Sequence, residues 1–269
     1  MSGSGRWTML KTHRRTFCFV WTVSVAGVLS WGTALAEPAP TLADGETFTY
    51  AVYLKHGFIS VKAGMAYLDV KKRDGEYEAT MTLKALSVVD MIYHLYARLT
   101  TRLTPELKPL RYEKHAEEGS CIYDEVSTFS YPSEGGCNIS SKQTFKDGTL
   151  KDGETRRSDQ VFDLLSLIFH ARRLDVSRLT PGARLDVAVI SGVKVKEQSL
   201  VYKGVEEVET DDGSKVKAGI FFLSSNEDGG VTARFAFLQE GRRVIQRIDI
   251  LHKYGSLSAR LRPTSRTGK

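Results

Sequence analysis

Three side chains that could do chemistry lie close together in one helical segment: Asp163, Ser166 and His170. A serine hydrolase needs a nucleophile, a base and an acid that orients the base. At helical spacing Ser166 and His170 come within reach of each other, but Asp163 lies about 10 Å from His170 along the helix axis. The serine therefore stands between base and acid, which is the wrong order. This spacing predicts no catalytic triad, and the three residues are interpreted as a polar edge of a helix.

Carboxylates at expected strand ends offer a second kind of chemistry. A glycosidase needs two facing acids about 5–10 Å apart, and Glu206, Glu207 and Glu209 are candidates by position. Sequence cannot place them opposite one another, and acidic turns are the ordinary explanation. The chain has no Gly-x-Ser-x-Gly, phosphate loop or dinucleotide fingerprint. We therefore expect no catalytic residue, and a hydrolase acting on envelope glycans is the least favoured reading.

Histidine and cysteine side chains are the usual ligands of zinc and related metals. The histidines are scattered, and no pair has the spacing or the flanking carboxylate of a zinc site; they are His13, His56, His94, His115, His170 and His252. The sequence therefore predicts neither a metal site nor a cofactor. Cys121 and Cys137 are the two cysteines left beyond the N-terminal segment. In an oxidising compartment such a pair predicts a disulfide across neighbouring strands.

Residues 1–36 have the pattern of an export signal. A basic start precedes an apolar stretch from Phe17 to Trp31, and Ala34-Leu35-Ala36 is a cleavage box before Glu37. Arg14-Arg15 leaves the general secretory and twin-arginine routes both open. We expect a periplasmic protein with no stable membrane span after cleavage.

Removal of that segment changes the charge balance. The whole chain has 38 Lys and Arg against 32 Asp and Glu, and four of the bases lie in residues 1–36. The remainder is nearly neutral, so the basic character predicts no nucleic-acid partner. From Arg242 to Lys269 there are eight bases and one acid, Asp249. This basic end could face an anionic envelope surface, or it could be a solvated strand face and tail.

One helix organises the expected fold. Apolar residues recur at helical spacing within Ser158–Asp175, with Ser158 as the expected N-cap. Ser87–Tyr96 predicts a short helix, and most other segments alternate as strands separated by Gly- and Asp-rich turns. We expect a mainly all-β protein, in which a large curved antiparallel sheet forms a roll or part-open barrel around the central amphipathic helix. The expected division is a flexible leader 37–45, a single domain 46–262 and a basic tail 263–269.

Aromatic residues are frequent on the expected strands. Because all three tryptophans lie in residues 1–36, most of these side chains should fill the core. The alternative is an apolar cavity of the kind found in ligand-carrying barrels. Its candidate lining residues are Tyr50, Phe58, Phe162, Ile168, Phe221 and Phe235.

Four short motifs, in this order, resemble a bacterial family called domain of unknown function 3108. They are the strand pair Tyr50–Gly64, the helix segment Phe162–Arg172, the strand Lys217-Ala218-Gly219, and the terminal Gly255–Leu261. The resemblance implies an exported β-rich domain without an established activity, and it carries over no catalytic residue.

Three functions remain open from the sequence. The favoured one is a non-catalytic periplasmic binding or carrier module for an apolar or glycan-lipid ligand. The alternative is an envelope assembly or scaffold protein that docks a protein partner. An enclosed ligand would favour the first, while a side-chain-filled interior with an exposed edge strand would favour the second. The hydrolase stands third.

Overall fold

The computed structural model describes residues 42–263, except 57, 92–93, 239–242 and 253–254. These residues all belong to one unit, 37–269. The expected signal peptide, and the expected tail beyond Pro263, lie outside the described residues. In the described ranges, no helix is long and apolar enough to cross a membrane.

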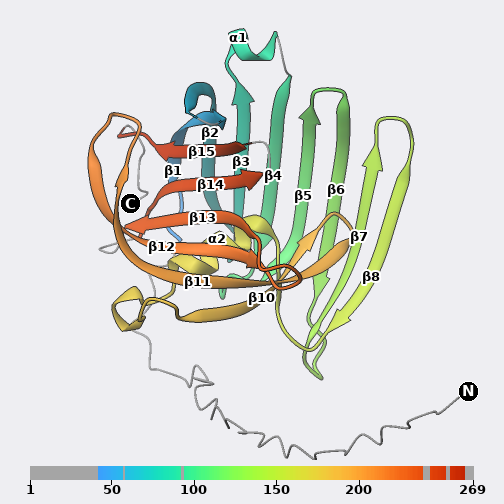
Figure 1. Cartoon of the computed structure of the whole chain (residues 1–269). Helices are drawn as coiled ribbons and strands as arrows, with labels where there is room; N and C mark the ends of the chain where they lie inside the picture. Colours follow the sequence, from blue (N-terminus) through green and yellow to red (C-terminus); the bar gives the residue numbers. More distant parts are fainter. Residues whose placement is uncertain (1–41, 57, 92–93, 239–242, 253–254, 264–269) are drawn as a thin grey trace, which may run out of the picture. The chain divides into compact units, whose positions relative to one another are not determined.

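Strands dominate the described part of the chain, as expected (Figure 1). They are β1 Thr47–His56, β2 Ile59–Arg73, β3 Glu76–Ala85, β4 Leu95–Leu103, β5 Pro109–Glu118, β6 Cys121–Ser130, β7 Cys137–Phe145, β8 Leu150–Arg157, β9 Val161–Phe162, β10 Arg184–Ser191, β11 Lys194–Glu209, β12 Lys215–Ser225, β13 Val231–Leu238, β14 Ile245–His252 and β15 Gly255–Leu261. The helices are α1 Ser87–Asp90 and α2 Leu164–Arg172, with a 3-10 turn η1 at Val176–Arg178.

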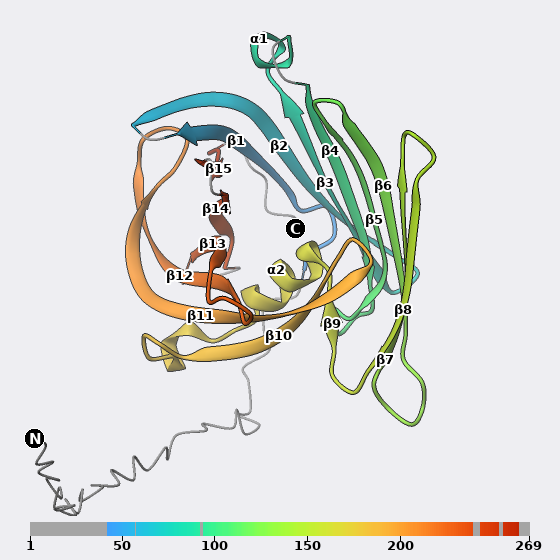
Figure 2. The ribbon, with the colours of Figure 1, turned by 45° about the vertical axis from the view of Figure 1, so that its right-hand side comes forward.

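All fifteen strands belong to one sheet, in the order β8-β7-β6-β5-β4-β3-β2-β1-β15-β14-β13-β12-β11-β10-β9. Two meanders, β1–β8 and β10–β15, are therefore joined where β1 pairs with β15. Neighbouring strands are antiparallel except for the parallel pair β9 and β10. The two meanders curl toward each other with α2 between them (Figure 2). The expected curved, nearly closed sheet is confirmed.

Bulges account for part of the curl. On β2, Ala63 is the extra residue, since Val52 pairs with Gly64 while Tyr53 pairs with Lys62. A Cβ on Gly64 would lie 2.5 Å from the carbonyl oxygen of Lys84, so this bend requires glycine. β11 has a second register shift between Tyr202 and Gly204. The sequence pattern predicts two strands on either side of Gly204, Val193–Lys203 and Val205–Glu209, whereas the structure contains one long bent strand.

The central helix α2 begins later than the sequence predicted. Asp163 is its N-cap instead of Ser158, because Val161 and Phe162 are drawn into the sheet as β9. Seven of its nine residues are buried, including both Leu165 and Leu167, which lie on different sides of the helix. Leu165 and Phe169 pack in one core cluster, whereas Leu167 and Ile168 pack in another. The helix therefore fills the interior and connects the two halves of the sheet.

Two further segments differ from expectation. The Asp- and Gly-rich residues 147–153 predict a turn, but β8 begins at Leu150 inside this segment. Its sequence LKDGETRR lacks apolar alternation, and its strand form depends on pairing with β7. In the expected flexible leader, Leu42 is buried in the first core cluster. The amide of Gly45 also donates a hydrogen bond to the carbonyl of Val70 at 3.0 Å.

Candidate functional site

The polar residues of α2 form a buried helix cap. The Asp163 carboxylate accepts hydrogen bonds from the amides of Leu165 and Ser166 at 2.9 and 3.0 Å and from the Thr101 hydroxyl at 2.8 Å. The Ser166 hydroxyl donates to the Asp163 carbonyl at 3.0 Å. Both residues are fully buried, and burial raises the pKa of Asp163. The residues predicted to form a polar edge of the helix therefore form a buried cap instead, because this end of the helix is covered by the sheet.

His170 takes no part in a triad. Its ring stacks on Phe162, with 4.8 Å between ring centroids. Burial, together with the nearby charge of Arg173, lowers the pKa of His170 to about 4. The imidazole is thus neutral, and it serves packing between helix and sheet.

A buried ion pair connects the other end of α2 to Glu46, the residue before β1. Arg172 donates to the two carboxylate oxygens of Glu46 at 3.1 and 3.3 Å, with side-chain exposures of 2% and 0%. The guanidinium also lies 5.8 Å from the ring of Phe48 and 5.9 Å from the ring of Phe169. A fully enclosed pair of this kind fixes the position of a helix and is inaccessible to a ligand.

The six candidate ligand residues do not come together in one place. Tyr50 lies in the first core cluster. Four belong to the second cluster and are at most 4% exposed; they are Phe162, Ile168, Phe221 and Phe235. Phe58 is fully exposed in the turn between β1 and β2. The interior around the first five is packed with side chains.

The predicted disulfide is wrong. Cys121 and Cys137 are both free, the first exposed and the second buried. They are on neighbouring strands, as expected, but at opposite ends: Cys121 begins β6, while Cys137 lies next to the pair formed by Asn138 and Ser130. Ten strand residues separate the two positions, which is about 30 Å. A disulfide needs Cα atoms within about 7 Å.

The strand-end carboxylates are held in ion pairs. Glu206 and Glu209 accept from Arg234 and Arg260 at 2.7 and 3.0 Å. Glu207 has Lys215 at 3.9 Å. These acids bind basic side chains on other strands, so the structure does not present them as a facing pair.

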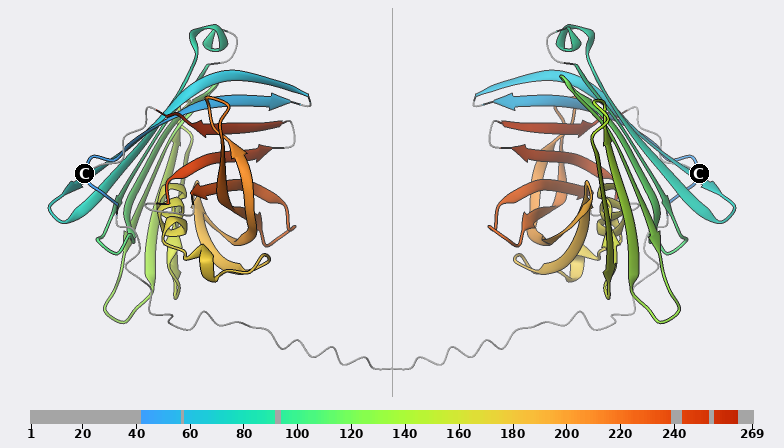
Figure 3. Two further views of the ribbon diagram at one scale, coloured as in Figure 1. Left: turned by 90° about the vertical axis from the view of Figure 1, so that its left-hand side faces the viewer. Right: turned by 90° about the vertical axis from the view of Figure 1, so that its right-hand side faces the viewer.

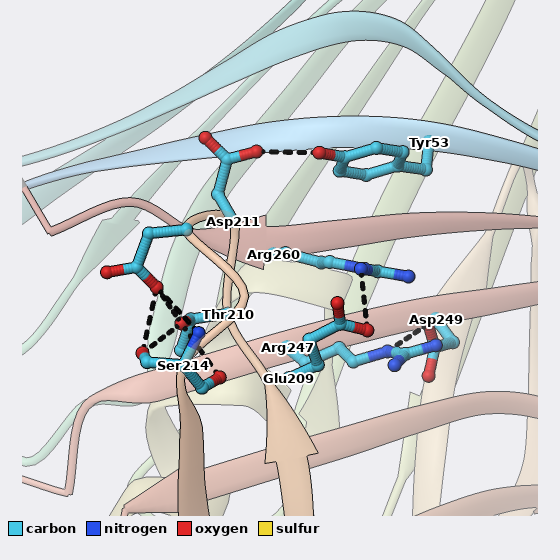
Figure 4. A network of polar contacts seen from close by, with 9 residues as sticks. Tyr53, Glu209, Thr210, Asp211, Ser214, Arg247, Asp249 and Arg260 are labelled. Atoms are coloured by element: carbon cyan, nitrogen blue, oxygen red, sulfur yellow. Dashed lines mark hydrogen bonds and ion pairs between the residues drawn. The ribbon is translucent and has the colours of Figure 1, made fainter.

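A polar row crosses four neighbouring strands. Asp249, Ser258, Tyr53 and Lys62 are successive register partners on β14, β15, β1 and β2. The β11–β12 turn covers this row (Figure 4). Its Asp211 carboxylate accepts from the Tyr53 hydroxyl at 2.8 Å and pairs with Lys62 at 3.3 Å.

Arginines complete the polar row. Asp249, with 6% side-chain exposure, pairs with Arg247 at 2.8 Å and with Arg234 at 3.2 Å. The Arg260 guanidinium lies 4.6 Å from the ring of Tyr53. These contacts clamp the β11–β12 turn and the neighbouring strands together, and the charges largely neutralise one another.

One residue further along the same strands, the opposite face carries an apolar row. Ile250, Leu257, Leu54 and Val61 are again successive register partners. Leu54, Val61 and Ile250 are 46%, 48% and 39% exposed, while Leu257 packs against the first core cluster. The row is thus an extension of the core that is left open, and it is our candidate functional site.

The sequence did not point to this row, although its members lie at alternate positions of expected strands. Only the pairing of β1 with β15 brings the two hairpins together. Phe58 was the candidate closest to it, because β1 and β2 meet in the turn beyond Leu54 and Val61.

A chain of histidines and carboxylates was also missed. Glu117 bridges His94 and His115 through their Nε2 atoms at 2.7 and 3.0 Å, and the Nδ1 atoms contact Asp90 and Asp124 at 2.8 Å. These contacts raise the pKa of both histidines, with the Glu117 contact contributing most. Among the described residues, no group of donors has an arrangement that could hold a metal ion.

The fold and the candidate site define a barrel-like β protein with a helix in its interior and an open apolar row on one face. A solved structure shares the fold: a beta-barrel-like protein of domain of unknown function DUF1849 from Brucella abortus. It has a TM-score of 0.55 and 10% identity, and the match covers 82% of this chain and 97% of that one. No curated protein matches the chain.

The family model described as Protein of unknown function (DUF3108) matches residues 49–262. The chain belongs to this family, and the resemblance noted in its sequence is confirmed.

Proposed function

We propose that the protein is an exported, non-catalytic binding module for an apolar or lipid-like ligand of the cell envelope. The observation that carries the proposal is the open apolar row of Ile250, Leu257, Leu54 and Val61. Folding leaves about 40–50% of the surface of Leu54, Val61 and Ile250 in water, whereas a bound acyl chain would cover the rest.

Because the interior is packed, the ligand would not occupy the internal cavity that the aromatic residues predicted. Tyr50, Phe221 and Phe235 are at most 1% exposed, and α2 occupies the space that a carrier barrel would leave open. The ligand would therefore lie along the row at the end of the strands. Export is supported by the signal pattern of residues 1–36.

Native mass spectrometry tests the proposal on protein expressed as the full chain and purified without detergent. We expect extra mass that dissociates on organic extraction, and its loss in the double variant Leu54→Ser, Val61→Ser. The matched control is Leu150→Ser, since Leu150 is similarly exposed at 52% but lies on β8. A clean protein mass in the wild type, or an adduct that survives in the double variant, would contradict the apolar-row site.

A second function is favoured by one observation. Within the sheet, β8 hydrogen-bonds to β7 alone, and five of its eight residues are exposed. The unpaired edge of a terminal strand can hydrogen-bond to a strand of another protein, which is how an assembly or scaffold protein would dock a partner. A photo-crosslinker placed at Glu154 in cells should then capture one partner, and a crosslinker at Glu78 on β3, a strand paired on both sides, should capture none.

A further inference from the structure

The turn between β1 and β2 has an exposed apolar tip. Phe58 is fully exposed, and Ile59 is 65% exposed. Behind them on the same hairpin, Val61 and Leu54 are about half exposed. Single exposed apolar residues are ordinary, but here they are concentrated at the outermost point of a hairpin, where folding gains nothing from them.

The two chain segments that form this end carry charge of a single sign. From Thr47 to Leu68 the chain contains Lys55 and Lys62 and no acid. The end of β14 and the start of β15 lie at the same end of the sheet, since Lys55 pairs with Ser256 and His252 pairs with Gly255, and the chain has no acid from Ile250 onward. Figure 3 shows β1, β2, β14 and β15 running side by side toward this end.

The neighbouring β11–β12 turn carries two acids, Asp211 and Asp212. Asp211 is paired with Lys62 on β2 and with Tyr53 on β1, which lie four and five residues from Phe58. Hydrogen bonds from Thr210 and Ser214 lower the pKa of Asp212 to about 2, so it stays charged. These carboxylates lie further from the end of the hairpin than Phe58 and Ile59. The two apolar side chains can therefore contact an anionic surface before the carboxylates approach it.

We propose that the β1–β2 tip anchors the protein to an anionic lipid bilayer, with Phe58 and Ile59 inserted at the interface and Lys55 at the level of the headgroups. A short apolar projection with flanking lysines fits a lipid surface. A stable protein interface would need about 800 Å² from each partner, which a hairpin tip does not offer. This anchor goes beyond the proposed function and does not depend on the ligand at the apolar row.

Tryptophan fluorescence tests insertion directly. All three native tryptophans lie in residues 1–36, so Phe58→Trp adds a reporter at the tip. The matched control is Met91→Trp, because Met91 is 81% exposed beside α1. With phosphatidylglycerol vesicles, we expect the emission of the Phe58→Trp protein to shift to shorter wavelength and to be quenched by brominated lipids. Phosphatidylcholine vesicles, and the Met91→Trp protein, should show neither effect.

Binding strength provides the second measurement. The double variant Phe58→Ser, Ile59→Ser should bind phosphatidylglycerol vesicles at least tenfold more weakly in sedimentation, with an unchanged melting temperature, while Met91→Ser should bind like the wild type. Higher salt should weaken wild-type binding. Intact mass shows whether residues 1–36 remain. If they remain, the difference in quenching between the Phe58→Trp and Met91→Trp proteins tests the insertion of the tip.

Three outcomes would overturn the anchor: no quenching at position 58, equal quenching at position 91, or a spectral shift that follows protein concentration without vesicles. The last outcome would mean that the tip packs against a second copy. The tip variants should keep any co-purified ligand, and the Leu54→Ser, Val61→Ser protein should retain position-58 quenching. The two proposals can therefore fail separately.

Discussion

Two rows of side chains, one residue apart on the same four strands, have opposite characters. The row of Asp249, Ser258, Tyr53 and Lys62 is covered by the β11–β12 turn. The row of Ile250, Leu257, Leu54 and Val61 has no such cover, and three of its members are about 40–50% exposed. The usual arrangement, with apolar residues sheltered and charges in water, is reversed here.

The reversal separates stability from function. The covered polar row holds the β11–β12 turn against β1 and β15, so it contributes to the fold. The open apolar row contributes less to folding than the core, because three of its side chains keep about 40–50% of their surface in water. We therefore expect substitutions in the two rows to affect different properties, with the packed interior around α2 as the reference.

The largest effect is expected in that interior. Leu165 is fully buried in the first core cluster, so Leu165→Asp should lower the free energy of unfolding by more than about 4 kcal/mol or prevent folding. Leu165→Ala should cost about 2–5 kcal/mol, and Leu165→Met less than about 1.5 kcal/mol. Urea unfolding measures all three. An unchanged midpoint for the Asp variant would show that α2 is not the packed centre.

The polar row should come next. Asp249→Ala would leave Arg234 and Arg247 facing each other without their shared carboxylate. Because these arginines are only 19% and 21% exposed, we expect a loss of about 2 kcal/mol. Lys215→Ala is the control, since the Lys215–Glu207 pair is exposed on both sides and should be worth less than about 1 kcal/mol. Equal effects of the two variants in urea unfolding would remove the distinction between covered and open charges.

A change of pH probes the interior without touching either row. His170 has a folded-state pKa of about 4 against an ordinary 6.5, so the unfolded chain takes up the proton first as the pH falls. The folded state is therefore not penalised by His170 above pH 6.5, and the free energy of unfolding falls progressively as the pH is lowered from 6.5 toward 4. Between pH 7 and 5 the loss should be about 2 kcal/mol. Phe in place of His170 should lessen the pH dependence by that amount, because the other titrating groups are common to both proteins. Identical pH profiles would mean that His170 is accessible to protons when folded.

The smallest effect on stability is expected in the apolar row. Leu54→Ser with Val61→Ser should change the free energy of unfolding by no more than about 1 kcal/mol, since exposed strand positions usually tolerate substitution. The same protein should lose the co-purifying ligand. A loss of several kcal/mol would show that the apolar row stabilises the fold as core residues do, and the proposed difference between the two rows would be wrong.

Much of the fold followed from the sequence. Strict alternation in Phe48, Tyr50 and Val52 predicted β1, and the Ala63-Gly64 pair marked the bulge in β2. The central helix was predictable from the spacing of Leu164, Leu165 and Ile168. Its N-terminus was not, because a parallel pairing with β10 takes Val161 and Phe162 into the sheet. Likewise, β8 has no alternation of its own and depends on β7.

The candidate site depended on contacts that local patterns do not encode. Leu54 and Leu257 become neighbours only through the pairing of the first and last strands. The disulfide was inferred from the number of cysteines, whereas the register puts Cys121 and Cys137 at opposite ends of their hairpin. Alternation reports which face a side chain occupies, but not what another part of the chain places over that face.

The pairing of β1 with β15 also has a consequence for the order of folding. During synthesis, β1 emerges early, but the partner for its second edge is the last strand of the sheet to be made. Until then, that edge stays open to unwanted pairing with other chains. Such non-local closure is slow compared with the formation of each hairpin. A chain that ends before Gly255 would leave both β1 and β14 with open edges, so the loss of one short terminal strand would separate the two meanders.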